Sequence, residues 1–175
     1  MTPVDGTTGP APVRAALAEF GPSAASPFFL TMANNPVVLP LWGRLVRGLL
    51  DATLPARDRE LLILRTAHQC GAAYPWNAHL GLGRRAGLSE AEIERIRADD
   101  LSSWDGRDRD LLDAADELHR RARISDSTWQ RLTEHYSPAQ LVEIPVLVGF
   151  YHLNSYAANS LDVGVAMTEP AERTG

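Results

Sequence analysis

The sequence predicts an all-α protein, a compact bundle of about six to eight helices. From about residue 28 onward the apolar residues recur at helical spacing, and no run alternates apolar and polar residues as a half-buried strand does. Prolines and Ser or Asn caps stand where helices would begin, and glycines stand where they would end. A chain of 175 residues with 45% hydrophobic content is sufficient for one domain with one core.

The N-terminal segment, residues 1–27, is predicted to be a flexible arm. It holds five prolines and three glycines, which disfavour regular structure, although one short helix fits Val13 to Phe20. We expect the helical domain to occupy residues 28–168 and a disordered tail to follow over residues 169–175.

Three proline signals divide the first half of the helical domain. Asn35 followed by Pro36 combines an N-cap with a proline at the first helical position. Pro55 opens a second helix, which Gly71 can close in a left-handed turn. Pro75 predicts the start of a third helix, because the residue before a proline is disfavoured in the α region.

Serine caps and one more glycine divide the second half. Gly87 ends the third helix, and Ser89 with Glu92 forms a capping box for a short fourth helix. The remaining signals predict a helix over 107–123, a cap at Ser125, and a last long helix from Ser137-Pro138 to about residue 163 that Pro145 should kink or split.

Composition excludes several classes of function. The net charge is -5 and the basic residues form no stripe, so we expect neither nucleic acid nor a membrane as a partner. All 17 basic residues are arginine, which excludes Schiff-base catalysis by a lysine. The single cysteine excludes an intramolecular disulfide. With no signal-peptide pattern and no long apolar run, the sequence predicts a cytoplasmic protein.

Glu60 and His79 are the candidate catalytic residues. Glu60 shares a helical stripe with Ile63, Leu64 and Ala67, so it is either an exposed first-turn residue or a buried carboxylate with a partner. His79 is either a structural histidine or a general acid–base. If their helices pack as a hairpin, the two side chains can meet. A simple antiparallel hairpin would set the two helix starts at opposite ends and leave Glu60 and His79 apart, so we expect a steep helix crossing or a second subunit to bring them together.

A second polar stripe lies on the last helix. His152, Tyr156 and Asn159 are spaced as i, i+4 and i+7, which fits a pocket lining but equally a helix kink or a subunit contact. Cys70 and the histidines have no established metal-ligand spacing, so the sequence predicts no metal site. No phosphate-binding loop or dinucleotide motif is present either, and no cofactor is expected.

Residues from about 35 to 96 resemble the carboxymuconolactone decarboxylase family, which includes the AhpD-like disulfide reductases. The last helix, through Tyr151 to Asn159, is similar more loosely. The features that carry the resemblance are Asn35-Pro36, Leu54-Pro55-Ala56-Arg57-Asp58-Arg59-Glu60-Leu61, Tyr74-Pro75-Trp76-Asn77-Ala78-His79 and Ala86-Gly87-Leu88-Ser89.

The resemblance distinguishes two branches of the family. In AhpD-like members the motif reads Glu-x-x-Cys-x-x-Cys-x-x-x-His; aligned on His79, the cysteine positions hold Ala72 and Pro75, and the glutamate position holds Gln69. The redox centre is therefore absent, and disulfide reductase or peroxidase activity is not expected. The chain is similar instead to the non-redox branch, whose decarboxylases act on a carboxylated lactone without a cofactor. Pro75 departs from that branch, which commonly has an acidic residue there.

The resemblance also implies an AhpD-like homotrimer or homohexamer with active sites near subunit contacts; a dimer is the alternative. An apolar surface supports self-association, because Trp42, Val46 and Leu49 and the run over residues 146–161 offer more apolar area than one small domain readily buries.

We therefore expect a cofactor-independent lyase or isomerase that acts on a small carboxylated lactone, keto acid or related metabolite. His79 would be the general acid, oriented by Glu60, and Tyr74 would contact the oxygen that receives electrons. The substrate would be bound by an apolar wall at Trp76, by Arg65 or Arg59, and by His152, Tyr156 and Asn159. The alternative is a non-catalytic helical homo-oligomer that binds a small molecule.

Overall fold

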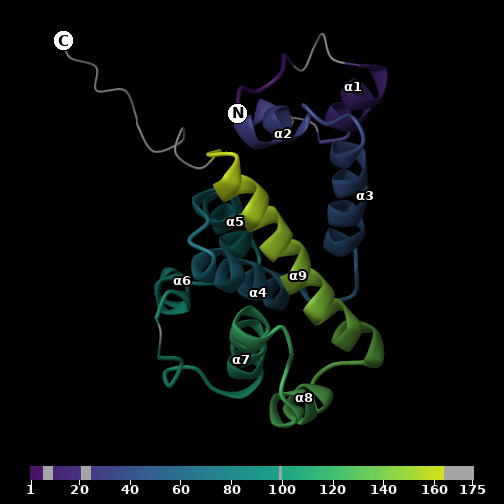
Figure 1. Cartoon of the computed structure of the whole chain (residues 1–175). Helices are drawn as coiled ribbons and strands as arrows, with labels where there is room; N and C mark the ends of the chain where they lie inside the picture. The colour runs from purple at the N-terminus through teal and green to yellow at the C-terminus, as the bar shows by residue number, and fades with distance from the viewer. Residues whose placement is uncertain (6–9, 21–24, 99, 164–175) are drawn as a thin grey trace, which may run out of the picture. The chain divides into compact units, whose positions relative to one another are not determined.

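The computed structural model describes residues 1–5, 10–20, 25–98 and 100–163, which form nine α-helices and no strand (Figure 1). The all-α prediction is confirmed. These described residues divide into two compact units: unit 1 comprises those within 1–51 and residues 158–163, and unit 2 comprises those within 52–157. The tail expected over residues 169–175 lies outside the described residues.

Unit 1 contains α1 (Ala11–Ala18), α2 (Pro27–Met32) and α3 (Val38–Leu50). An aromatic cluster holds it together, since the ring of Trp42 lies 5.2–5.8 Å from those of Phe20, Phe28 and Phe29. The segment expected to be an arm thus includes two helix starts and part of this core. Proline at the first positions of both helices explains why the segment is compatible with helix formation there.

Helix α3 corrects both the predicted start and the predicted apolar surface. Asn35 Oδ1 accepts hydrogen bonds from the backbone N–H groups of Val37 and Val38, but the helix begins at Val38 with Val37 as its N-cap, two residues after the start predicted at Pro36. Trp42 and Val46, expected to form an apolar surface, are instead buried in unit 1. The exposed apolar side chains of α3 lie on the adjacent stripe one residue away, at Val38, Leu41 and Leu45.

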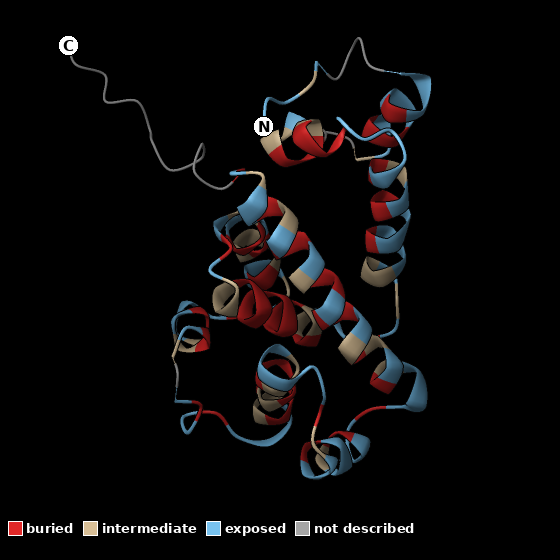
Figure 2. Cartoon of the chain, in the orientation of Figure 1, coloured by how far each residue is buried: buried red, intermediate tan, exposed pale blue. Residues whose placement is uncertain are grey.

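Unit 2 contains the candidate site. Its helices are α4 (Ala56–Gln69), α5 (Ala73–Arg85), α6 (Glu90–Ile96), α7 (Gly106–Arg121), α8 (Asp126–Thr133) and most of α9 (Pro138–Ser160). Helix α4 is the central element, because it contacts α5, α6 and α7. Residues 60–67 of this helix are all buried, as the continuous red ribbon in Figure 2 shows.

The local signals account for most helix ends in unit 2. Gly71 and Gly87 have φ values of +57° and +99° after α4 and α5, and Ser89 forms the expected capping box at α6. The start predicted at Pro75 is wrong, because α5 begins at Ala73 with Pro75 as its third residue. An amide N–H in the first helical turn has no intrahelical acceptor, so a proline there loses nothing. In the described part of the chain, no helix is long and apolar enough to span a bilayer.

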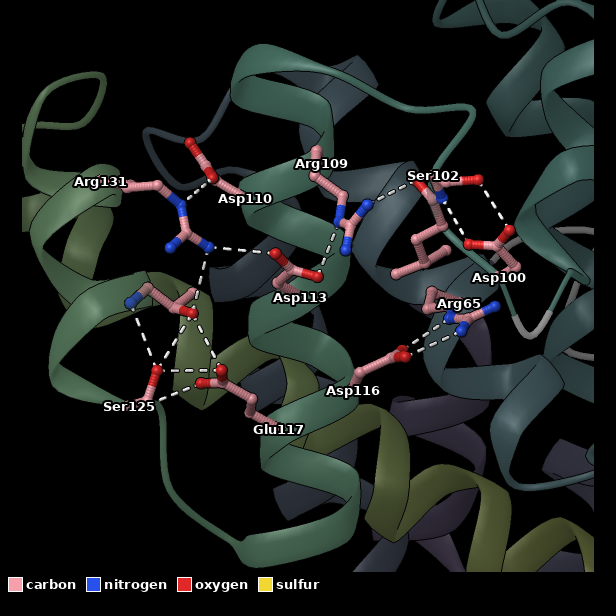
Figure 3. A network of polar contacts seen from close by, with 12 residues as sticks. Arg65, Asp100, Ser102, Arg109, Asp110, Asp113, Asp116, Glu117, Ser125 and Arg131 are labelled. Atoms are coloured by element: carbon pink, nitrogen blue, oxygen red, sulfur yellow. Dashed lines mark hydrogen bonds and ion pairs between the residues drawn. The ribbon is translucent and has the colours of Figure 1, made fainter.

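A buried ion pair links three helices of unit 2 (Figure 3). The guanidinium of Arg65 on α4 donates to both carboxylate oxygens of Asp116 on α7, at 2.7 and 2.9 Å. Its remaining nitrogen donates to the backbone carbonyls of Ile96 and Ala98, at 2.6 and 2.7 Å. Because both side chains are buried and are joined by two hydrogen bonds, the pair fixes the distance between α4 and α7.

Gly83 permits close packing of α5 against α4. A Cβ atom at this position would lie 3.2 Å from Leu64 Cδ1 and 3.2 Å from Leu88 Cδ1, both on buried side chains. At Gly81, on the same helix, a Cβ would meet only Arg85 Nη1, at 3.6 Å. Of these two glycines of α5, only Gly83 is closely approached by side chains of its neighbours.

We predict that Gly83→Ala is less stable than Gly81→Ala by about 1–2 kcal/mol, because Gly81→Ala gains helix propensity without a clash. The measurement is the urea midpoint of unfolding, followed by circular dichroism. Equal midpoints for the two variants would show that the side chains of Leu64 and Leu88 move aside at no cost in free energy, and that the close approach does not affect stability.

Candidate active site

The turn between α4 and α5 determines which residues of the two helices meet. Glu60 precedes Cys70, the C-cap of α4, by ten residues (70 - 60), and His79 follows Ala72, the N-cap of α5, by seven (79 - 72). Residues at such similar distances from a tight turn lie at a similar height in a helical hairpin, since three residues of helix span only about 4.5 Å. The side chains of glutamate and histidine are long enough to bridge that difference.

Glu60, His79 and Tyr151 form one hydrogen-bonded chain. Glu60 Oε2 lies 2.7 Å from His79 Nδ1, and Tyr151 Oη lies 2.9 Å from His79 Nε2. The three side chains come from α4, α5 and α9, and the whole residues are 1%, 8% and 1% exposed. Both ring nitrogens of His79 are therefore occupied inside the protein.

The carboxylate of Glu60 determines which nitrogen of His79 carries the proton. A carboxylate only accepts hydrogen bonds, so Nδ1 must be the donor in this contact. In the neutral ring Nε2 then has a lone pair, which accepts the hydroxyl proton of Tyr151. Nε2 is thus the atom through which His79 can take up or release a proton.

Burial keeps the hydroxyl of Tyr151 protonated. Desolvation raises the pKa of Tyr151 above its ordinary value, and the charge of Glu60 acts in the same direction. Tyr74 and Arg59 also influence this hydroxyl, and Arg59 lowers the pKa. Arg59 Nε lies 3.5 Å from Glu60 Oε1, so a cation stands beside the chain of three residues. Tyr74 and Arg59 are partly exposed.

The predicted contact between Glu60 and His79 is confirmed, and it forms within one chain. No second subunit is needed to bring the two residues together. Tyr151 was not predicted as a site residue. The available signal was a tyrosine inside the apolar last helix, but the polar stripe beginning one residue later gave the stronger pattern.

Two residues predicted to bind substrate are placed elsewhere. All three guanidinium nitrogens of Arg65 are engaged with Asp116 and two backbone carbonyls, so Arg59 is the arginine beside the site. Trp76 is buried under the guanidinium of Arg97, at 4.5 Å, and lines a cavity of about 180 Å³ to which neither Glu60 nor His79 contributes.

The polar stripe of α9 also faces away from His79. His152 Nε2 lies 3.0 Å from His119 Nδ1 on α7, and Tyr156 is 60% exposed with its ring against that of His152. Asn159 is exposed and belongs to unit 1. Successive residues of a helix point about 100° apart, so the side chains of Tyr151 and His152 face different neighbouring elements.

The fold brings together a second chemical cluster that sequence spacing did not predict. Ligand atoms of Cys70, His119 and His152 all lie within 4.8 Å of one another. These residues come from the end of α4, the end of α7 and the middle of α9, so only the tertiary structure juxtaposes them.

Comparisons with known proteins agree with this fold. Residues 36–117 match the model of the carboxymuconolactone decarboxylase family. No curated protein matches the sequence significantly.

Solved structures share the fold at low sequence identity. An alkylhydroperoxidase AhpD core from Ralstonia eutropha JMP134, an uncharacterized peroxidase-related protein, is 20% identical with a TM-score of 0.77, and the match covers 89% of this chain and 86% of that one. The debrominase Bmp8 in its apo form is 16% identical with a TM-score of 0.75, covering 94% of each chain. A protein of unknown function from Agrobacterium tumefaciens is 23% identical with a TM-score of 0.68, covering 74% and 90%.

The matched segment contains Glu60 and His79, and the structural matches extend over most of the chain. The chain is thus similar to the carboxymuconolactone decarboxylase family over residues 36–117, and it has the all-helical AhpD-like fold.

Proposed function

We propose that this protein is a cofactor-independent lyase or isomerase that transfers a proton to or from a carbon atom next to a carbonyl group. The observation that carries the proposal is the buried chain from Glu60 through His79 to Tyr151. A histidine with one nitrogen fixed by a carboxylate and the other held by a hydroxyl is arranged for general acid–base chemistry. The substrate would be a small carboxylated lactone, a keto acid or a related metabolite.

The proton passes through Tyr151. In the basic direction, the Tyr151 hydroxyl gives its proton to His79 Nε2 while its oxygen takes the proton from substrate carbon. In the acidic direction His79 begins as the imidazolium, and the same two transfers run in reverse: Nε2 gives its proton to the Tyr151 oxygen while the Tyr151 hydroxyl protonates the carbanion left by loss of carbon dioxide. Tyrosinate need not accumulate in either direction, and the raised pKa of Tyr151 is therefore compatible with a relay.

The charges around the relay suit this reaction. When Nε2 takes up a proton, the imidazolium lies 2.7 Å from the carboxylate of Glu60, which stabilises it. The developing negative charge on the substrate needs a cation or hydrogen-bond donors, and Arg59 and Tyr74 are the partly exposed groups on that side. We assign Arg59 to the substrate carboxylate or enolate, and Tyr74 to the oxygen that receives the electrons.

Two-thiol chemistry is not available to one copy of the chain. A disulfide cycle needs two cysteines in reach of each other, and the sequence has one. The peroxidase-related and debrominase proteins share the fold at 16–20% identity, which supports no transfer of their activities.

We predict that Glu60→Gln, His79→Gln and Tyr151→Phe each lower turnover by about 10²-fold or more, the size expected when general acid–base catalysis is lost. The assay follows carbon dioxide release, or deuterium uptake at carbon in deuterated water, over a panel of small β-keto acids and carboxylated lactones. The double variant of Glu60 and His79 should be little worse than either single variant, because the two residues act as a unit.

The matched control is Tyr136→Phe, which removes another buried tyrosine hydroxyl that is bonded to a carboxylate, Asp58, at 2.8 Å. This variant should keep its turnover even if its stability falls. Full activity in Glu60→Gln or His79→Gln would refute the proposed mechanism. A panel without any turnover or exchange would favour the alternative, a helical oligomer that only binds a small molecule.

We also propose that the protein forms a homo-oligomer, a trimer or hexamer by analogy with its family and otherwise a dimer, in the cytoplasm. The exposed apolar residues of α9 in unit 2 support self-association. Val142, Val146, Leu153 and Tyr156 are 64%, 46%, 50% and 60% exposed and follow one stripe, at spacings that fit a packing seam between helices.

We predict that light scattering gives a mass that is a multiple of 19.1 kDa, and that Val146→Glu with Leu153→Glu shifts the protein to the monomer. Two charges would be buried without partners in any interface formed by this stripe. The control is Glu134→Gln, an exposed change at the end of α8 that should leave the mass unaltered. A stable monomer of the unaltered protein would contradict the proposal.

A further inference from the structure

Cys70, His119 and His152 form a cluster that the chain of Glu60, His79 and Tyr151 does not use. The thiol and the imidazole nitrogens lie within 4.8 Å of one another, and the two imidazoles stack with centroids 5.2 Å apart. We propose that these three side chains bind one Zn²⁺ ion or a similar late transition-metal ion, with water as the fourth ligand.

The donor set fits zinc. Thiolate sulfur and imidazole nitrogen are its preferred ligands, and sites with three protein ligands and one water are common. In a tetrahedral site with bonds of 2.0–2.3 Å the donor atoms lie about 3.3–3.6 Å apart. His119 Nδ1 and His152 Nε2 are 3.0 Å apart, and shifts of about 1 Å or less would bring all three donors to that separation.

The ring of His152 is held with the correct nitrogen toward the cluster. Its Nδ1 lies 2.9 Å from the backbone carbonyl of Val148, so Nδ1 carries the proton and donates it. Nε2 is then the atom with the lone pair, and it faces His119. A backbone carbonyl on the far nitrogen is the usual means of orienting a metal-binding histidine. In the absence of metal, His119 Nδ1–H donates to that lone pair. A metal ion at Nδ1 would require the ring proton to sit on Nε2 instead.

Only one of the three ligands must lose a proton on metal binding. Burial lowers the pKa of His119, and the neighbouring His152 acts in the same direction, so the ring is neutral near neutral pH. Burial raises the pKa of the Cys70 thiol, while the Ser155 hydroxyl beside it lowers the pKa. Metal binding would therefore release the thiol proton, while the ring proton of His119 moves from Nδ1 to Nε2, and affinity should rise with pH because the thiol must ionise.

The surroundings admit a cation. Cys70 caps the C-terminus of α4 and His119 lies in the last turn of α7, so the negative ends of two helix dipoles point toward the cluster. Asp116 adds negative charge, and Arg65 and Arg120 add positive charge near His119. His119 is exposed and lines a cavity of about 450 Å³, which gives a metal ion and its water a route to the site.

The test uses Co²⁺ as a spectroscopic substitute for Zn²⁺, with the full chain expressed without a histidine tag and treated with chelator. We expect one Co²⁺ per chain, a thiolate-to-cobalt charge-transfer band, and loss of both on addition of Zn²⁺. Zn²⁺ should also raise the unfolding temperature, as any ligand of the folded state does.

Three variants and one control locate the site. Cys70→Ser should abolish the charge-transfer band. His119→Asn and His152→Asn should each weaken Zn²⁺ binding by about 100-fold or more, because mutating a residue that only hydrogen-bonds a metal ligand already lowers metal affinity about 10–100-fold. His119 is exposed, so its replacement tests binding even if Cys70→Ser folds poorly. His135→Asn, which changes an exposed histidine outside the cluster, should bind like the unaltered protein.

The proposal is overturned if Co²⁺ and Zn²⁺ do not bind at micromolar concentration, if no thiolate band forms, or if His135→Asn weakens binding as much as His119→Asn. None of these outcomes bears on proton transfer by His79, because the readouts are metal binding and stability and not turnover.

Discussion

The buried charges of α4 are the constraint on which the arrangement of unit 2 depends. Asp58, Glu60 and Arg65 are 0%, 1% and 3% exposed, and an unpaired charge in such a position costs several kcal/mol. Each therefore needs a partner on a different neighbouring segment.

The partners connect α4 to the rest of unit 2. Asp116 on α7 pairs with Arg65, His79 on α5 pairs with Glu60, and Tyr136, which follows α8, donates to Asp58. Burying a helix with charges on several faces thus selects one packing of its neighbours. The candidate active site and the structural ion pairs are products of the same constraint.

What separates the candidate site from the structural pairs is the chemistry of the partner. Arg65 is permanently charged, and the pKa of Tyr136 is raised by burial and by Asp58, so these pairs do not exchange protons near neutral pH. An imidazole exchanges protons readily in that range, and His79 has its second nitrogen bonded to a hydroxyl. Glu60 is therefore the buried charge of α4 that is coupled to a group able to move a proton.

Sequence patterns predicted the parts of the structure that local chemistry determines. Ser89 and Ser125 cap helices where expected, Gly71 and Gly87 end them, and the hairpin signals led to the contact between Glu60 and His79. The start of α5 was misplaced because a proline in the first turn is as compatible with a helix as one at its start.

Long-range pairing could not be predicted in the same way. The partner of Arg65 lies 51 residues away, and Tyr151 lies 72 residues from His79. Helical periodicity shows which residues share a face but not which helix that face meets, so Arg65 was expected in the site and Tyr151 was not. The cluster of Cys70, His119 and His152 was not predicted for the same reason, because its members lie on three separate helices.

Glu60 fixes the proton of His79 on Nδ1 and leaves Nε2 for exchange through Tyr151. Imidazole nitrogen NMR of the protein with isotopically labelled histidine tests it directly, since the two ring nitrogens have distinct shifts in each protonation form. The account predicts a proton on Nδ1 of His79 in the resting protein, and loss of this preference in Glu60→Gln. A resting protein whose His79 carries its proton on Nε2 alone would contradict the account.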